Sequence, residues 1–185
     1  SQIHVVSKIN SEILEYEKID FLKSIQSSIS RLQVDTLLGL LMHNSDLMNK
    51  WNVEFSNKVN FLKEKKIIYY FGVSIYSNDE FELALANKDI DIIQIPYNLF
   101  DQRALQFKWF EKAKKKNKLI FIRSIFLQGL LLMDIEKIPE KLYRSRPYIH
   151  VLDNLAKELN LTKNELCLSF VNATASDSVL LFGCE

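Results

Sequence analysis

Apolar residues recur along this chain in short runs, and amphipathic stretches separate one run from the next. Each run is rich in β-branched and aromatic residues and has the length of a buried strand. The predicted strands are Ile3–Ile9, Asp35–Met42, Ile67–Ser74, Ile90–Ile95, Leu119–Ile125 and Ser178–Phe182.

The segment Asp91–Asn98 shows how these strands end. Its isoleucines predict a strand buried on both faces. Pro96 closes the strand because proline has no N–H to donate to a neighbour. Gln94 and Asn98 therefore lie at or near the carboxyl end, where ligands bind in α/β folds.

Helical patterns fill the stretches between the strands. The Ser77–Glu80 and Thr162–Glu165 segments are capping boxes, each opening a helix. In the helix around Phe55–Leu62 we expect Lys58 to lie on the solvent face. Further helices are predicted over residues 21–32, over Ala104–Lys116 without a break, and from Pro147 onward.

Strands alternating with helices predict βαβ units and a parallel sheet. No glycine-rich turn follows the first strand, so the Rossmann dinucleotide fingerprint is absent. An open doubly wound sheet also fits, but a TIM (β/α)8 barrel is better supported because polar residues follow each strand. Six strands do not close an eight-stranded barrel. We therefore expect an α/β fold with one partial barrel domain over residues 1–185, cut at both ends from a longer protein.

The carboxyl ends of barrel strands meet at one rim, so polar residues there form a candidate site. Any one of them alone fits a structural role, and it is their joint occurrence that indicates a site. A guanidinium at Arg123, within an apolar strand, requires an anionic or hydrogen-bond-accepting partner. The candidates are Lys8, His43, Ser74, Gln94, Asn98, Arg123 and Ser124.

The composition of the chain limits the kinds of partner molecule that we expect. The chain of 185 residues is 48% hydrophobic and 25% charged, with a formal net charge of +1, which gives no argument for nucleic acid or a membrane surface as partner. No apolar run reaches the roughly 18–20 residues of a membrane span. Cys167 and Cys184 have no metal or redox spacing, so we expect a reduced, cytoplasmic protein without a metal site.

Several of these segments, in order along the chain, resemble the aldo/keto reductases. They are Ser7–Lys8, Leu40–His43, Gly72–Ser74, Gln94–Asn98, Arg123–Leu131 and Leu181–Glu185. The resemblance implies a TIM barrel of which this chain covers strands three to eight. It also implies hydride transfer between NADP(H) and a small-molecule carbonyl or alcohol, with sugar-like carbonyls among the expected substrates.

The resemblance also assigns roles. Lys8 and His43 match two of the four catalytic residues: Lys8 would lower the pKa of a proton-donating tyrosine, and His43 would orient the carbonyl oxygen. Ser74 and Gln94 match positions that hold the nicotinamide carboxamide. Cofactor contacts are also expected from Arg123, Ser124 and Gln128.

The sequence departs from the family pattern where Ile75 replaces an asparagine and where Arg123 replaces a stacking aromatic residue. The resemblance implies that the family's catalytic Asp and Tyr belong to the first two strands, which this chain lacks, and that its loop for the 2′-phosphate follows the last strand, where the chain stops at Glu185. We therefore expect residues 1–185 alone to be inactive. Two alternatives stay open: a non-catalytic barrel that binds or regulates, and an aldolase using Lys8 as a Schiff-base amine. No oligomeric state is predicted.

Overall fold

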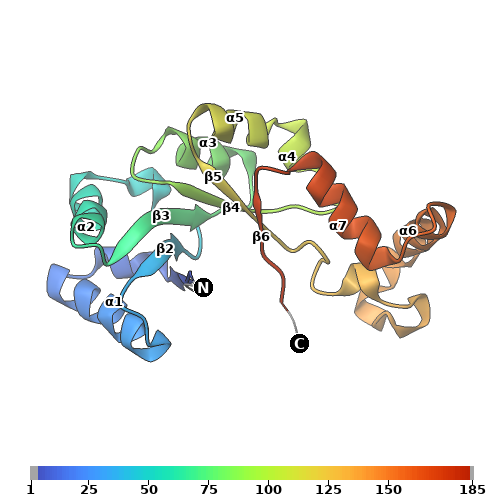
Figure 1. The fold of residues 1–185 in the computed structure, drawn as a ribbon, viewed down its shortest axis with the longest axis horizontal. Helices are drawn as coiled ribbons and strands as arrows, with labels where there is room; N and C mark the ends of the chain where they lie inside the picture. Colours follow the sequence, from blue (N-terminus) through green and yellow to red (C-terminus); the bar gives the residue numbers. More distant parts are fainter. Residues whose placement is uncertain (1–3, 184–185) are drawn as a thin grey trace. The chain divides into compact units, whose positions relative to one another are not determined.

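The computed structural model describes residues 4–183, which form a parallel α/β fold (Figure 1). Its six strands are hydrogen-bonded in chain order, from β1 to β6, as consecutive strands of a (β/α) barrel are. The strands are β1 (Val6–Ile9), β2 (Leu37–Met42), β3 (Ile68–Ser74), β4 (Ile92–Pro96), β5 (Leu119–Arg123) and β6 (Val179–Leu180). All six predicted strands are present, most of them shorter than predicted, and Ile3 and Cys184 lie outside the described residues.

Seven α-helices occur within residues 4–183, together with several short 3-10 turns. Both predicted capping boxes are present, at the start of α3 and of α7. The helices are α1 (Lys18–Leu32), α2 (Val53–Glu64), α3 (Asn78–Ala86), α4 (Arg103–Gln106), α5 (Trp109–Lys115), α6 (Arg146–Glu158) and α7 (Lys163–Thr174). The 3-10 turns are η1 (Ser11–Glu15), η2 (Met48–Lys50), η3 (Leu130–Leu132), η4 (Ile135–Lys137) and η5 (Glu140–Ser145).

The expectation of one continuous helix over Ala104–Lys116 is wrong. Lys108 adopts a left-handed backbone conformation, with φ of +57°, and this ends α4 and starts α5 as a separate helix. The new helix axis lets Trp109 stack on Phe81 of α3, with ring centroids 4.9 Å apart. The Trp109 indole N–H also donates to the side-chain oxygen of Asn78 at 2.9 Å.

The chain divides into two compact units. The first contains residues up to Ile95 together with Phe107–Ile120, and the second contains Pro96–Gln106 together with residues from Phe121 onward. The expectation of a single domain stays a prediction.

In the first unit, the register of β1 to β4 sorts side chains onto two faces. Successive residues of a strand point to opposite faces, and registered partners in a parallel sheet share a face. One face carries buried apolar side chains, among them Phe71, whose ring lies 6.1 Å from that of Trp51 in the link between η2 and α2. The opposite face contains Lys8, Leu41, Gly72 and Ile92 on one level.

Lys58 does not lie on the solvent face of α2, as the sequence predicted. Its side chain is 5% exposed. The ammonium group donates to the carbonyl oxygens of Leu14 and Tyr16, both at 2.6 Å, and pairs with Glu54 at 2.8 Å. A buried cation is tolerated here because these oxygens replace its water. Lys58 thereby ties α2 to η1.

In the second unit, α7 packs on Tyr97, the residue that follows β4. The Tyr97 ring stacks on Phe170 at 5.4 Å, and its hydroxyl is hydrogen-bonded to that of Thr174 at 2.7 Å. Burial raises the pKa of Tyr97, and the bond to Thr174 opposes the shift. Tyr97 is therefore a packing residue, although the sequence placed it near the ligand-binding end of the strand.

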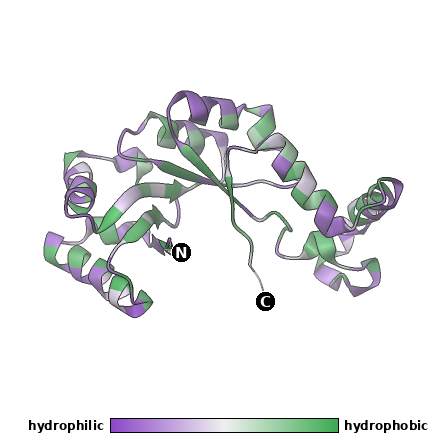
Figure 2. Cartoon of the chain, in the orientation of Figure 1, coloured by the Kyte–Doolittle hydropathy of each residue, from purple (hydrophilic) through white to green (hydrophobic). Residues whose placement is uncertain are grey.

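The distribution of hydrophilic and hydrophobic residues along the helices agrees with this fold. Figure 2 shows bands of both colours along α1, as expected of a helix with one buried and one solvent face. Within residues 4–183, no helix combines the length and the apolar character that a membrane span requires.

Candidate active site

Polar side chains occupy the carboxyl end of the first unit's sheet. Strand register pairs Ser74 with Gln94, and Met42 with Val73, which places His43 on the same level as Ser74. Lys8 is registered with Leu41, two residues before His43, and so lies one layer lower on the same face. The sequence predicted these four residues at strand ends along one rim, and the register of β1 to β4 places them on one face.

Ser74 and Gln94 are in direct contact. The Ser74 hydroxyl donates to the side-chain oxygen of Gln94 at 3.3 Å, and the residues are 1% and 2% exposed. The Gln94 amide still has N–H donors, and its oxygen has a second lone pair. This pair can therefore donate to and accept from one amide ligand, which is what a carboxamide requires.

On β2 to β4, the level below the polar layer is apolar and close-packed, and Lys8 of β1 lies on the same level. A Cβ atom added to Gly72 would come within 2.6 Å of the Ile92 carbonyl oxygen, so only glycine fits there. The Cδ1 atom of Ile92 also lies 3.1 Å from the corresponding position at Gly39. Ile92 thus fills the space that the two glycines leave open.

Lys8 and His43 belong to neighbouring strands, Lys8 within β1 and His43 directly after β2. Lys8 is half-buried, whereas His43 is exposed directly after β2. The backbone N–H of His43 donates to the Ile9 carbonyl at 2.8 Å, which continues the β1–β2 ladder to the end of the strands. An ammonium group and an imidazole are thus presented from adjacent strand ends on one face.

In the second unit, Arg123 ends β5 and Ser124 starts a tight turn. An Arg123 guanidinium N–H donates to the Ser124 hydroxyl at 3.2 Å, which supplies part of the acceptor that the sequence required. Ser124, Leu127, Gln128 and Gly129 have positive φ, between +49° and +84°. The chain therefore curls sharply after β5 and leaves Gln128 exposed.

Asn98 fixes the loop after β4 beside that turn. Its side-chain oxygen accepts from the backbone N–H groups of Phe100 and Asp101, at 2.9 and 3.0 Å. Its amide donates to the Ser124 carbonyl at 3.1 Å. Asn98 is 1% exposed, so it is a structural residue that holds the two loops together.

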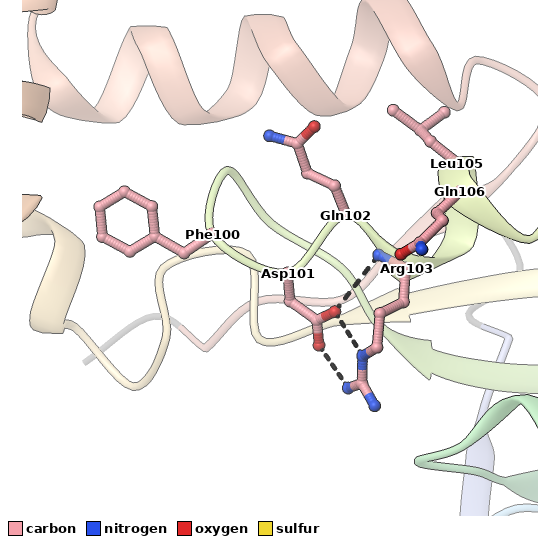
Figure 3. Close-up of a pocket in the computed structure, with 6 residues that line it drawn as sticks. All are labelled: Phe100, Asp101, Gln102, Arg103, Leu105 and Gln106. Carbon is pink, nitrogen blue, oxygen red and sulfur yellow. Dashed lines mark hydrogen bonds and ion pairs between the residues drawn. The ribbon is translucent and has the colours of Figure 1, made fainter.

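A hollow of about 620 Å³ opens in the loop after β4 (Figure 3). The Asp101 carboxylate faces the Arg103 guanidinium and accepts at 2.8 and 2.6 Å. These bonds from Arg103 lower the pKa of Asp101, and the charge of Arg123 acts in the same direction. The hollow is lined by Phe100, Asp101, Gln102, Arg103, Leu105 and Gln106.

The family model for the aldo/keto reductases matches residues 1–184. The chain belongs to the aldo/keto reductase family. Comparison with curated protein sequences gives no match.

Solved structures of other aldo/keto reductases share the fold. The chain resembles the holo form of aldo-keto reductase AKR11C1 from Bacillus halodurans with a TM-score of 0.72 and 19% identity, covering 96% of this chain and 61% of that one. It resembles the glycerol dehydrogenase AKR11B4 from Gluconobacter oxydans with a TM-score of 0.71 and 19% identity, covering 91% and 55%. An aldo/keto reductase from Klebsiella pneumoniae in complex with NADP and acetate gives 0.70 and 16%, covering 98% and 60%.

These comparisons confirm the predicted partial TIM barrel. They also show that the chain spans 55–61% of the length of these three reductases.

Some polar contacts of this aldo/keto reductase chain were not predicted. Ser11 donates to the Asn44 side-chain oxygen at 2.7 Å, and Asn44 donates to the Asp46 carboxylate at 2.6 Å. The available signal was the polar Asn44–Asp46 segment directly after His43. In residues 4–183, His, Cys, Asp and Glu side chains nowhere gather in threes as a metal site would need.

Proposed function

We propose that this chain forms the nicotinamide-facing part of an NADP(H)-dependent aldo/keto reductase acting on a small or sugar-like carbonyl. The observation that carries the proposal is the registered polar layer, in which Ser74 and Gln94 contact each other while His43 and Lys8 share their face. The donor and acceptor set of Ser74 and Gln94 fits a carboxamide.

NADP(H), when bound, supplies or accepts the hydride. The family resemblance assigns the carboxamide to Ser74 and Gln94 and further cofactor contacts to Arg123, Ser124 and Gln128. A guanidinium can stack on a flat ring, so Arg123 suits the place where relatives use an aromatic side chain.

His43 and Lys8 would act on the carbonyl. His43 would hold its oxygen by a hydrogen bond, which orients the carbon for attack and stabilises the negative charge that develops. The ammonium group of Lys8 would favour the ionised form of a neighbouring tyrosine, which eases proton delivery near neutral pH. Residues 1–185 hold two members of the family's catalytic set, so we expect them to be inactive without a Tyr and an Asp.

The test is fluorescence titration with NADPH of the protein expressed from its complete gene, and of its Arg123→Ala variant. We expect the natural protein to quench NADPH fluorescence saturably and the variant to bind about tenfold more weakly, as the loss of one stacked, hydrogen-bonding cation predicts. Saturable binding would justify a screen of aldehydes and sugar carbonyls. Absence of binding by the natural protein would refute the reductase proposal.

A second function is a barrel that binds NADP(H) as a sensor without turnover. Ile75 favours it, because this side chain is fully buried where relatives place an asparagine, so one polar contact to the carboxamide is replaced by packing. The two functions separate in one assay: a sensor binds NADPH but does not oxidise it with any carbonyl of the screen, whereas a reductase does.

A further inference from the structure

We propose that Ser11 and Asn44 are positioning residues that fix His43 relative to Lys8. The inference rests on the proposed reductase function and deepens it, because neither residue was assigned a role in the site. Ser11 lies three residues after Lys8, and Asn44 directly follows His43. Their side chains join the loops after β1 and β2.

The contact is a partly buried hydrogen bond. The Ser11 hydroxyl donates to the Asn44 side-chain oxygen at 2.7 Å, and Ser11 is 1% exposed. Because Ser11 is buried, loss of its Asn44 partner would leave the hydroxyl without an equivalent acceptor in bulk water, which costs free energy. The Asn44 amide is itself oriented by its bond to the Asp46 carboxylate at 2.6 Å, so the oxygen is kept toward Ser11.

The backbone adds a second tie between the same two segments. The His43 N–H donates to the Ile9 carbonyl at 2.8 Å. His43 and Asn44 are therefore held by two residues, Ile9 and Ser11, of the segment that carries Lys8. Two ties on consecutive residues restrain rotation of the loop about either one, which a single bond would allow.

Lys58 of α2 holds the segment that follows β1 in place. Its ammonium group binds the carbonyl oxygens of Leu14 and Tyr16, at the end of η1, at 2.6 Å each. Ser11 therefore belongs to a segment held at both ends, by β1 on one side and by Lys58 on the other. Such a segment can serve as a rigid reference for the loop that carries His43.

The position of His43 relative to Lys8 matters for hydride transfer, because a displacement of about 1 Å in a catalytic group can lower the rate about a hundredfold. The proposed cofactor residues Ser74 and Gln94 lie on β3 and β4 and are hydrogen-bonded to each other, whereas the Ser11 hydroxyl is hydrogen-bonded to Asn44. Loss of the Ser11–Asn44 bond should therefore lower turnover while leaving NADPH affinity unchanged. A merely structural role would change both together or neither.

The experiment compares Ser11→Ala, Ser11→Thr and Asn44→Asp in the protein expressed from its complete gene. Ser11→Ala removes the donor, and Asn44→Asp keeps an acceptor for Ser11 but sets a carboxylate against Asp46. In Ser11→Ala and Asn44→Asp we expect kcat to fall about ten- to a hundredfold while NADPH affinity stays unchanged. Ser11→Thr keeps the hydroxyl and should retain most of the natural kcat. Ser28→Ala, which removes a hydroxyl bonded to the Ser24 carbonyl within α1, is the matched control and should keep full activity.

A second measurement does not need turnover. In NMR spectra the ring Cε1–H resonance of His43 should move or broaden in Ser11→Ala and stay in place in Ser28→Ala. An unchanged His43 resonance with unchanged kcat would overturn the proposal, as would an equal loss of kcat and NADPH affinity. A natural protein that neither binds NADPH nor reduces any carbonyl would instead refute the reductase function, while the His43 resonance would still test the contact.

Discussion

The Ser74 hydroxyl lies 3.3 Å from the side-chain oxygen of Gln94, its registered partner on the neighbouring strand. A buried serine and glutamine that share one hydrogen bond keep each other in a single orientation. Such a fixed orientation would lower the entropy cost of binding the proposed carboxamide.

The first prediction concerns this pair. Ser74→Ala removes one hydroxyl from the expected carboxamide site and frees the Gln94 side chain to rotate. We expect NADPH affinity to fall about five- to tenfold, the effect of losing one net hydrogen bond. Isothermal titration of the natural protein and variant measures it, with Ser27→Ala on the exposed face of α1 as the matched control. Equal affinity in all three proteins would remove Ser74 from the cofactor site.

The second prediction concerns the buried ammonium of Lys58. Lys58→Met keeps the length and apolar stem of the side chain but leaves the Leu14 and Tyr16 carbonyls without their donor. We expect a loss of about 2–4 kcal/mol in the free energy of unfolding, because buried polar groups become unsatisfied. Urea denaturation measures it. Lys50→Met, on an exposed residue, should change stability by less than about 0.5 kcal/mol, and a similar small change in Lys58→Met would show that its carbonyl contacts carry no stability.

The third prediction concerns Gly72. Gly72→Ala would place a methyl group 2.6 Å from the Ile92 carbonyl oxygen and 2.8 Å from its Cβ, so the backbone must shift. We expect a destabilisation of about 1–3 kcal/mol from overpacking, measured by thermal and urea unfolding. Gly183→Ala has no neighbour within 4 Å and serves as the control. A Gly72→Ala protein as stable as the control would mean that strands β3 and β4 separate more easily than their packing suggests.

The fourth prediction concerns Cys167, which is 1% exposed in α7. Burial raises the pKa of its thiol from 9.0 to about 11. Below pH 9.0 the thiol is neutral in both folded and unfolded states, so its contribution to stability is fully present. As pH rises from 9.0 toward 11, the unfolded thiol ionises first and that contribution is lost.

The measurement is the free energy of unfolding across that pH range. In a Cys184→Ser background, which leaves one cysteine, the additional Cys167→Ala change should flatten the decline of stability with pH. The same background gives a chemical check, since a neutral buried thiol reacts slowly with iodoacetamide until the protein unfolds. Rapid alkylation of the folded protein would contradict the burial of this side chain.

The strand pattern could be predicted from sequence because it depends on local composition. Runs of isoleucine and valine ending in Pro96 or Ser74 leave little choice of structure, and the polar residues at their ends follow from chain direction alone. The capping boxes at Ser77 and Thr162 were equally local. The family resemblance then assigned roles to these positions, which composition could not.

What the sequence did not predict depends on contacts between distant residues. Lys58 lies at a position that helical spacing assigns to solvent, and only the carbonyls of Leu14 and Tyr16 make its burial favourable. No glycine or proline lies within residues 104–116 to indicate the break between α4 and α5 at Lys108. The bond between Ser11 and Asn44 joins residues 33 positions apart, and nothing in either local pattern indicates the other.

Ile92 has a consequence for how a ligand could reach the polar layer. Its atoms lie within 3.1 Å of the positions that a Cβ would take at Gly39 and Gly72, so hydrocarbon fills the level below Ser74 and Gln94 on β2 to β4, while Lys8 of β1 lies on that level too. A group held by Ser74 and Gln94 would meet this hydrocarbon on the side toward the amino ends of β2 to β4. The lower boundary of the proposed site is therefore a residue without a polar side-chain atom, and Ile92→Val, which removes Cδ1, would leave a methyl-sized space beside Gly39.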